Sequence, residues 1–300
     1  MKYLKEMQSH IADSFRIFIR NPIFILSSFF VDLLFFLLFG IVYSFFSSGM
    51  IEHLIEVNNL IGELNSQLSA ITAGSEDNAV LSAIMQQQSV VMEHLKWIGI
   101  YVGLIVVSTY ILWCIFQGIN WHLASWVTHK KKTHFYVYLG RFSLLNLIWL
   151  IALGLIGYIT YKLSVYNAMA TITVISQNSI NYLMLFLAAV LLYLAVVSYS
   201  FSAKEGFLGS LKNAFVLGVR KARFYAASYL LVALAVFLVY LLISLLNLGL
   251  VAAVLVDLVI MLPMFAYGRV LFLSISSGES GGESGKEKVG KGKINPKRKR

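Results

Sequence analysis

The chain has 300 residues, of which 59% are hydrophobic and 13% charged, and its mean hydropathy is +0.78. Soluble domains carry about one quarter charged residues, so the composition excludes an ordinary soluble protein and indicates a membrane protein. The net charge of +10 is divided among separate basic groups along the chain, so we expect no nucleic acid partner.

Six stretches are long enough and apolar enough to cross a bilayer, which requires about 20 residues of helix. Only three prolines interrupt 300 residues, so long helices are expected. The sequence therefore predicts an all-α, polytopic membrane domain at 1–272 with six transmembrane helices. The predicted spans are about 23–47, 97–118, 142–161, 182–203, 224–246 and 248–272.

The distribution of basic residues predicts how these spans are oriented. With both termini inside, every one of the 24 basic residues except Lys96 and Lys162 faces the cytoplasm. Basic residues concentrate on the cytoplasmic side of membrane proteins. We therefore expect a multi-pass protein of the cell membrane with cytoplasmic N and C termini.

A basic, aromatic stretch precedes the first, third and fifth spans, at 14–22, 134–142 and 214–224. This predicts three repeats, each a cytoplasmic interfacial helix followed by a transmembrane hairpin. Alternatively, the three stretches share only the composition common at cytoplasmic membrane boundaries. In both cases we expect contact with anionic lipid headgroups. The residues expected to make it are Arg16, Arg20, Lys130, Lys131, Lys132, Arg141, Arg220, Lys221, Arg223 and Arg269.

The segment at 50–96, between the first two spans, carries two helical stripes separated by the turn-rich sequence TAGSEDNAV. The residues of each stripe are alternately three and four apart, which is the spacing of a coiled-coil seam. The stripes pair antiparallel about one turn, which predicts a projecting extracytoplasmic helical hairpin. The alternative is two amphipathic helices lying flat on the outer leaflet. The predicted seam contains Leu54, Val57, Ile61, Leu64, Leu68, Ile71, Leu81, Ile84, Gln88, Val91, Leu95 and Ile98.

Two acidic residues lie inside the spans, Asp32 in the first and Asp257 in the last. Both come roughly 14 Å along their helices, near the middle of the hydrocarbon core. Together with Asn146 they form a candidate midplane polar site that could hold a proton or a cation. The alternative is that each acid is protonated or hydrogen-bonded locally and only fixes helix packing. Arg269 is expected at the cytoplasmic edge, with its guanidinium reaching lipid phosphates.

Catalytic and metal-binding motifs are absent from the sequence. It contains no H-E-x-x-H, Walker loop or G-x-S-x-G pattern, and its single cysteine and six histidines show no metal-ligand spacing. We therefore expect no catalytic residues, no metal site and no cofactor. Residues 273–300 are rich in Gly, Ser and Lys without apolar periodicity, which predicts a disordered basic cytoplasmic tail.

The three phenylalanine-led basic stretches and the sequence FQGINWHLASWVTHKKKTHFYVYLGRF at 116–142 carry a resemblance to known proteins. The chain resembles, over about 10–272, a superfamily of six-span prokaryotic membrane proteins. It includes the YciC-like proteins and the membrane domain attached to some glycerophosphodiester phosphodiesterases. The resemblance implies the six-span fold and little about chemistry, and the long hairpin at 50–96 departs from it.

These observations favour a non-enzymatic membrane scaffold or accessory protein. Its outer hairpin would present a surface to a protein partner or to a second copy of the chain, and its basic inner face would rest on anionic lipid. A small-solute or lipid transporter that uses the midplane acids is the alternative. A second alternative is an intramembrane enzyme acting on lipid.

Overall fold

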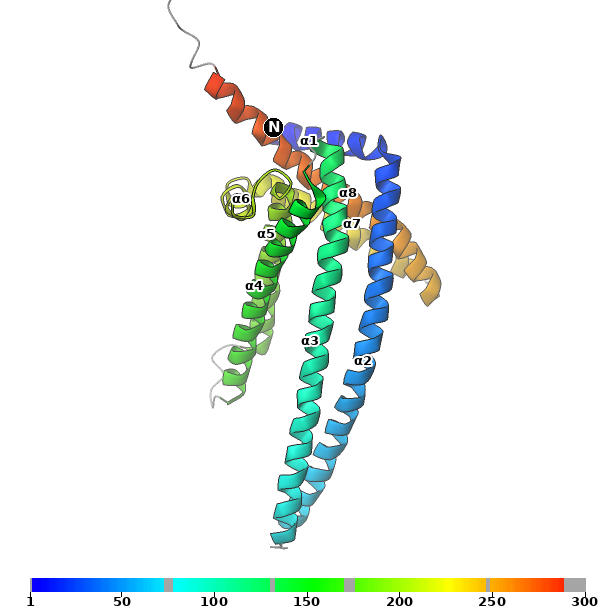
Figure 1. Cartoon of the computed structure of the whole chain (residues 1–300), viewed down its shortest axis with the longest axis vertical. Helices are drawn as coiled ribbons and strands as arrows, with labels where there is room; N and C mark the ends of the chain where they lie inside the picture. The colour runs from blue at the N-terminus through cyan, green and yellow to red at the C-terminus, as the bar shows by residue number, and fades with distance from the viewer. Residues whose placement is uncertain (1, 73–77, 130–132, 170–175, 247–248, 289–300) are drawn as a thin grey trace, which may run out of the picture. The chain divides into compact units, whose positions relative to one another are not determined.

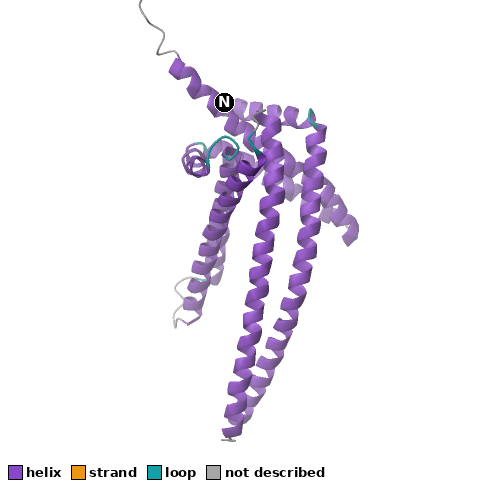
Figure 2. Ribbon diagram, viewed as in Figure 1, coloured by secondary structure: helices purple, strands orange, loops and turns teal. Residues whose placement is uncertain are grey.

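The computed structural model describes residues 2–72, 78–129, 133–169, 176–246 and 249–288. These residues form helices joined by short connections, without a strand, which confirms the all-α class (Figures 1 and 2). The helices are α1 (Lys2–Ile19), α2 (Pro22–Thr72), α3 (Asn78–His129), α4 (Phe135–Met169), α5 (Gln177–Phe201), α6 (Phe207–Arg220), α7 (Ala222–Leu245) and α8 (Leu250–Lys288).

Six of these helices, α2 to α5, α7 and α8, contain segments long and apolar enough to cross a bilayer. Each contains one of the six predicted spans or most of it, so the chain has the build of a multi-pass membrane protein. The segments are Pro22–Ser66, Gln87–His129, Phe135–Asn167, Gln177–Phe201, Ala222–Leu245 and Ala252–Ser276.

The chain divides into two compact units. Unit 1 combines Met1–Leu33 with Cys114–Arg300, and unit 2 is Leu34–Trp113. The first helical turns of α2 and the last turns of α3 therefore belong to unit 1, whereas the long remainder of both helices forms unit 2.

Unit 1 has a core rich in aromatic residues, built from α1 and the ends of the spanning helices. Phe142 of α4 and Tyr199 of α5 are buried, with their ring centroids 4.8 Å apart. On the adjoining turns, the indole of Trp149 donates to the hydroxyl of Ser198 over 3.1 Å. The indole N–H of Trp149 thus has a partner inside the core, as an environment without water favours.

α1 lies across α8 and then turns sharply into α2 (Figure 1). The hydroxyls of Ser14 and Ser274 are 2.6 Å apart, and the ring of Phe18 packs edge-on against Tyr267. The turn follows from Asn21 and Pro22. The Asn21 side chain donates to the carbonyl of Ile17, and Pro22 suits the first position of a helix because it lacks an N–H.

Two of the three predicted interfacial helices are separate helices. α1 covers most of the first stretch, to Ile19, and α6 covers most of the third before the chain breaks at Lys221. The prediction for 134–142 is wrong, because this stretch is the beginning of α4, without a break between it and the span. The stretch contains Gly140 and Arg141 but no proline, so the helix propagates directly into the apolar sequence.

α8 extends past the predicted boundary between membrane domain and tail at 272/273. α8 continues to Lys288, and residues 273–276 are buried in the core of unit 1. The hydroxyl of Ser276 donates to the carbonyl of Ser200, and Lys204 donates to the carbonyl of Ser276. These contacts join the end of the apolar segment of α8 to Ser200 of α5 and to Lys204 just after it. Residues 289–300 lie outside the described residues.

Unit 2 is an antiparallel pair of helices, in which α2 and α3 run side by side in opposite directions (Figure 1). The Nδ1 atoms of His53 and His94 are 2.8 Å apart, so one imidazole donates and the other accepts. Trp97 stacks on His53 with ring planes 7° apart. Gly49 permits the ring of Tyr101 to lie against α2, because a Cβ at that position would be 2.6 Å from the ring.

The seam of this hairpin differs in part from the predicted one. Val57 is buried, and Leu64, Val91 and Ile98 are half-buried, as expected for seam residues. In contrast, Leu54, Gln88, Ile61 and Leu95 are exposed, and His53, Leu60, Gln87 and His94 take the inner positions instead. The side chains of Leu68, Ile71, Leu81 and Ile84 lie outside the described residues.

The physical reason for this difference is the rotation that the polar and aromatic contacts impose on each helix. The His53–His94 hydrogen bond and the close approach of Tyr101 to Gly49 set which faces meet. One residue of rotation, about 100°, exchanges an apolar residue such as Leu54 for its neighbour His53.

A cross-linking experiment distinguishes the two arrangements. Cysteines at Val57 and Val91 should be joined by a short bifunctional thiol reagent faster than cysteines at Ile61 and Val91, both on a Cys114→Ala background. Val57 and Val91 are one turn from the bonded histidines and face inward, whereas Ile61 is 45% exposed. Equal or reversed rates in intact membranes would support the originally predicted seam.

Candidate functional site

A buried ion pair joins α2 and α8 in unit 1. The guanidinium of Arg269 holds the carboxylate of Asp32 with two parallel hydrogen bonds, each 2.9 Å long. Asp32 is 1% exposed and Arg269 6% exposed. This fork-to-fork geometry is the strongest arrangement available to an arginine and a carboxylate.

Three polar side chains complete the site. The Ser28 hydroxyl accepts from Arg269 over 3.0 Å, and the Gln117 oxygen accepts from the other guanidinium nitrogen over 2.8 Å. The Gln117 and Asn120 amides donate to the carboxylate of Asp32 over 2.9 and 2.7 Å. We call these five residues, Ser28, Asp32, Gln117, Asn120 and Arg269, the Asp32–Arg269 cluster.

Helical spacing explains how three elements supply this cluster. Ser28 and Asp32 are four residues apart on α2, and Gln117 and Asn120 are three apart on α3, so each pair shares one helix face. Each pair lies within a strongly apolar sequence. Both faces are buried against α8, where the guanidinium of Arg269 neutralises the carboxylate of Asp32.

The electrostatics of the cluster favour a fixed structural element. A carboxylate and a guanidinium that pair in an apolar environment cancel in net charge, and extra hydrogen bonds offset the cost of removing both from water. One oxygen of Asp32 accepts three bonds and the other accepts one. Both oxygens of the carboxylate therefore accept hydrogen bonds. The Oδ1 atom of Asn120, in contrast, is buried with no donor among the described residues.

The structure corrects the prediction for Arg269 as a lipid-headgroup residue. Its guanidinium is buried against Asp32 rather than exposed at a membrane surface. Asp32 and Arg269 are 237 residues apart in the chain, so no local pattern indicates that they pair. Gln117 and Asn120 were also missed, although two amides at helical spacing in an apolar span are the signal that marks them.

The structure does not bring the three predicted midplane residues together. Asn146 accepts a hydrogen bond from Tyr199 and donates to the carbonyl of Phe142. Asp257 is 12 residues before Arg269 on α8, which is about 18 Å along the helix axis. Its Oδ1 atom is buried without a donor among the described residues. Asp32 alone of the three belongs to the cluster.

The other residues predicted to touch lipid headgroups fall into different environments. Arg16, Arg20, Arg220 and Arg223 are exposed, and Lys221 is half-buried. Arg141 is half-buried and donates to the carbonyl of Glu205 over 3.0 Å. Residues 130–132, which include three of the predicted lysines, lie outside the described residues.

In the described part of the chain, no group of three or more His, Cys, Asp or Glu side chains is arranged to hold a metal ion. No protein family model, curated protein or solved structure matches this chain. The resemblance to the YciC-like superfamily therefore stays a prediction based on the sequence.

Proposed function

We propose that the chain is a non-enzymatic scaffold or accessory protein of the membrane, whose α2–α3 hairpin presents a docking surface to a protein partner. The observation that carries this proposal is an exposed apolar stripe on α2, about 44–58 Å from Pro22 along the helix. The geometry of the helices, the stripe and the surrounding charges each support it.

The lengths of α2 and α3 imply that unit 2 extends past the bilayer. α2 has 51 residues and α3 has 52, so each is about 76–78 Å long. A bilayer with its headgroups is about 40–45 Å thick. Leu54 lies 32 residues after Pro22, about 48 Å along α2, and Leu95 lies 34 residues before His129, about 51 Å along α3.

An apolar stripe runs along this distal part of α2. Ile51, Leu54, Ile55 and Ile61 are each more than 40% exposed. At about 100° per residue they fall on one face, which is neither the face turned to α3 nor the acidic face. Met92 and Leu95 add exposed apolar surface on α3. Outside lipid, a contiguous apolar surface of this kind is typical of a protein interaction site.

Charge defines the class of partner. Residues 50–96 contain six acidic side chains and one basic side chain, Lys96. Glu52, Glu56 and Glu63 form the acidic face of α2, next to the stripe. The surface therefore suits an amphipathic helix that has an apolar face and basic flanks.

A photo-cross-linking residue tests the proposal in intact membranes. Placed at Leu54, in the stripe, it should give a discrete protein adduct, whereas the same residue at the matched position Glu56 should not. Ile61→Asp should abolish the adduct at Leu54 because it puts a charge into an apolar contact, and Glu56→Gln should leave it unchanged.

Two outcomes would contradict the proposal: equal adducts from Leu54 and Glu56, or an adduct that survives Ile61→Asp. The amount of folded protein in the membrane, measured in parallel, separates loss of the partner from loss of the hairpin.

The transporter alternative receives less support from the geometry. It relied on Asp32 and Asp257 as two unpaired acids at a shared depth. Asp32 is neutralised by Arg269, and its two oxygens together accept four hydrogen bonds. Release of a proton or cation from this carboxylate would require the cluster to come apart.

A further inference from the structure

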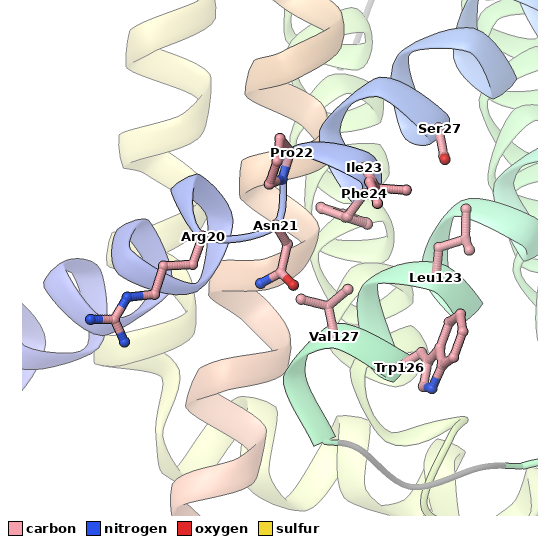
Figure 3. Close-up of a pocket in the computed structure, with 9 residues that line it drawn as sticks. All are labelled: Arg20, Asn21, Pro22, Ile23, Phe24, Ser27, Leu123, Trp126 and Val127. Atoms are coloured by element: carbon pink, nitrogen blue, oxygen red, sulfur yellow. The ribbon is translucent and has the colours of Figure 1, made fainter.

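A pocket lies in unit 1 where the break between α1 and α2 meets the last turns of α3 (Figure 3). Its volume is about 430 Å³, and it is partly open to the outside. It is lined by Arg20, Asn21, Pro22, Ile23, Phe24, Ser27, Leu123, Trp126 and Val127. None of the lining residues belongs to the Asp32–Arg269 cluster, so the pocket is a separate site.

Along α2 the lining is polar at both ends of the pocket and apolar between them, at Pro22, Ile23 and Phe24. Arg20 and Asn21 lie at the break before the helix, and Ser27 lies one to two turns further on. Figure 3 shows Asn21, Leu123, Trp126 and Val127 around the space, with Arg20 on the side of α1. Ile23 is 80% exposed and Trp126 53% exposed, so the apolar walls open toward the surroundings of the protein.

One positive charge, that of Arg20, lies at the end of the pocket formed by the break between α1 and α2. Arg16 is paired with Asp13, whereas Arg20 has no carboxylate within ion-pair distance among the described residues. The pocket lining contains no acidic side chain. α2 begins here with Pro22, which has no N–H, and the amide of Ile25 bonds to the carbonyl of Asn21, so the helix end offers at most the amides of Ile23 and Phe24 to a negative charge. An anion at this rim would therefore meet a cation and a helix N-terminus without a competing carboxylate.

The pocket suits a ligand that has a negatively charged group for the Arg20 end and an apolar chain for the apolar walls. We propose that it binds one anionic glycerophospholipid from the leaflet on the side of α1. The phosphate would sit at the rim beside Arg20, and an acyl chain would follow Ile23 and Leu123 inward beneath Trp126. Indole side chains commonly take this position, with an apolar body against the chain and an N–H near the headgroups.

This inference concerns unit 1 and does not depend on the hairpin or its partner. It differs from general attraction between basic residues and anionic lipid because it assigns a bound lipid to one cavity. Binding of this lipid then depends on both Arg20 and the cavity, whereas general attraction depends equally on every exposed arginine of α1.

Native mass spectrometry of the full chain tests the proposal after reconstitution in equal amounts of phosphatidylglycerol and phosphatidylcholine. Arg20→Gln should lower the ratio of retained phosphatidylglycerol to phosphatidylcholine about five-fold, which corresponds to about 1 kcal/mol per basic residue at an anionic membrane. Arg16→Gln, which removes the same charge one turn earlier, should leave the ratio unchanged. Arg20→Lys should keep most of the preference.

A second variant tests the cavity itself. Ser27→Phe fills its deeper end without removing an apolar core side chain, and should reduce retention of both lipids by one molecule per chain. Equal losses in Arg16→Gln and Arg20→Gln would overturn the proposal, as would unchanged retention in Ser27→Phe. A thermal unfolding measurement on each variant ensures that only folded protein is compared.

Discussion

Replacing Asp32 by leucine should lower the free energy of unfolding by about 3–5 kcal/mol, because it leaves the guanidinium of Arg269 buried without a counter-charge. Arg269→Met should have an effect of similar size, since it strands the carboxylate. The measurement is reversible unfolding in mixed micelles, or the thermal midpoint where unfolding is irreversible.

The double variant Asp32→Leu with Arg269→Met should cost much less than the sum of the two single variants. An apolar pair of similar volume removes both charges at once, and such replacements are often close to neutral. The difference is the coupling energy of the pair, which a double-mutant cycle isolates. Additive effects would mean that the two residues stabilise the protein independently. That result would contradict the two parallel hydrogen bonds between them.

Asp257 provides the matched control for this cycle. It is the other aspartate inside a span, but its Oδ1 atom is buried without a donor in the described part of the chain. Asp257→Leu should therefore cost little or be stabilising, because it removes a buried carboxyl oxygen that has no hydrogen-bond donor among the described residues. A cost equal to that of Asp32→Leu would contradict the assignment of the structural charge to Asp32.

The six spans could be predicted from the sequence because the signal for them is local. Twenty or more apolar residues in a row determine a spanning helix whatever surrounds it, and the six predicted segments correspond to six helices. The antiparallel hairpin was also visible, since its two stripes lie close together in sequence. The rotation of each helix about its axis could not be predicted. Leu54 and His53 are neighbours, and only the contacts of α2 with Tyr101 and His94 determine which of the two faces inward.

The site could not be predicted, because it depends on contacts between distant parts of the chain. Arg269 looked like a headgroup residue, since an arginine near the end of a span usually reaches the interface. Its pairing with Asp32 is set by how α8 packs against α2, and no local pattern records that packing. The end of α8 is a different case, because its apolar segment continues through Leu273 and Ile275 to Ser276 and both side chains are buried.

The packing that holds α3 in place leads to a second large effect. Phe142 is fully buried, with its ring 4.8 Å from that of Tyr199 and stacked 6.1 Å from that of Tyr138. It also faces Gly118, where an added Cβ would be 3.4 Å from the ring. Gly118 lies between Gln117 and Asn120, so Phe142 packs directly behind the turn that supplies both amides of the cluster.

Phe142→Ala should therefore lower the free energy of unfolding by about 3 kcal/mol, the lower end of the range for Phe→Ala in protein cores. The lower end applies because helices in lipid associate by packing rather than by removal of apolar surface from water. Phe186→Ala is the control, since Phe186 also lies on a spanning helix but is 65% exposed, and it should cost almost nothing.

Because Phe142 supports the turn that carries Gln117 and Asn120, its loss should also weaken the ion pair. In the Phe142→Ala background, the coupling energy between Asp32 and Arg269 should fall, since the two amides are less firmly held against the carboxylate. The same coupling in the Phe186→Ala background should be unchanged. An equal coupling energy in both backgrounds would mean that the aromatic core and the cluster stabilise unit 1 separately, and that the amides are positioned by α3 alone.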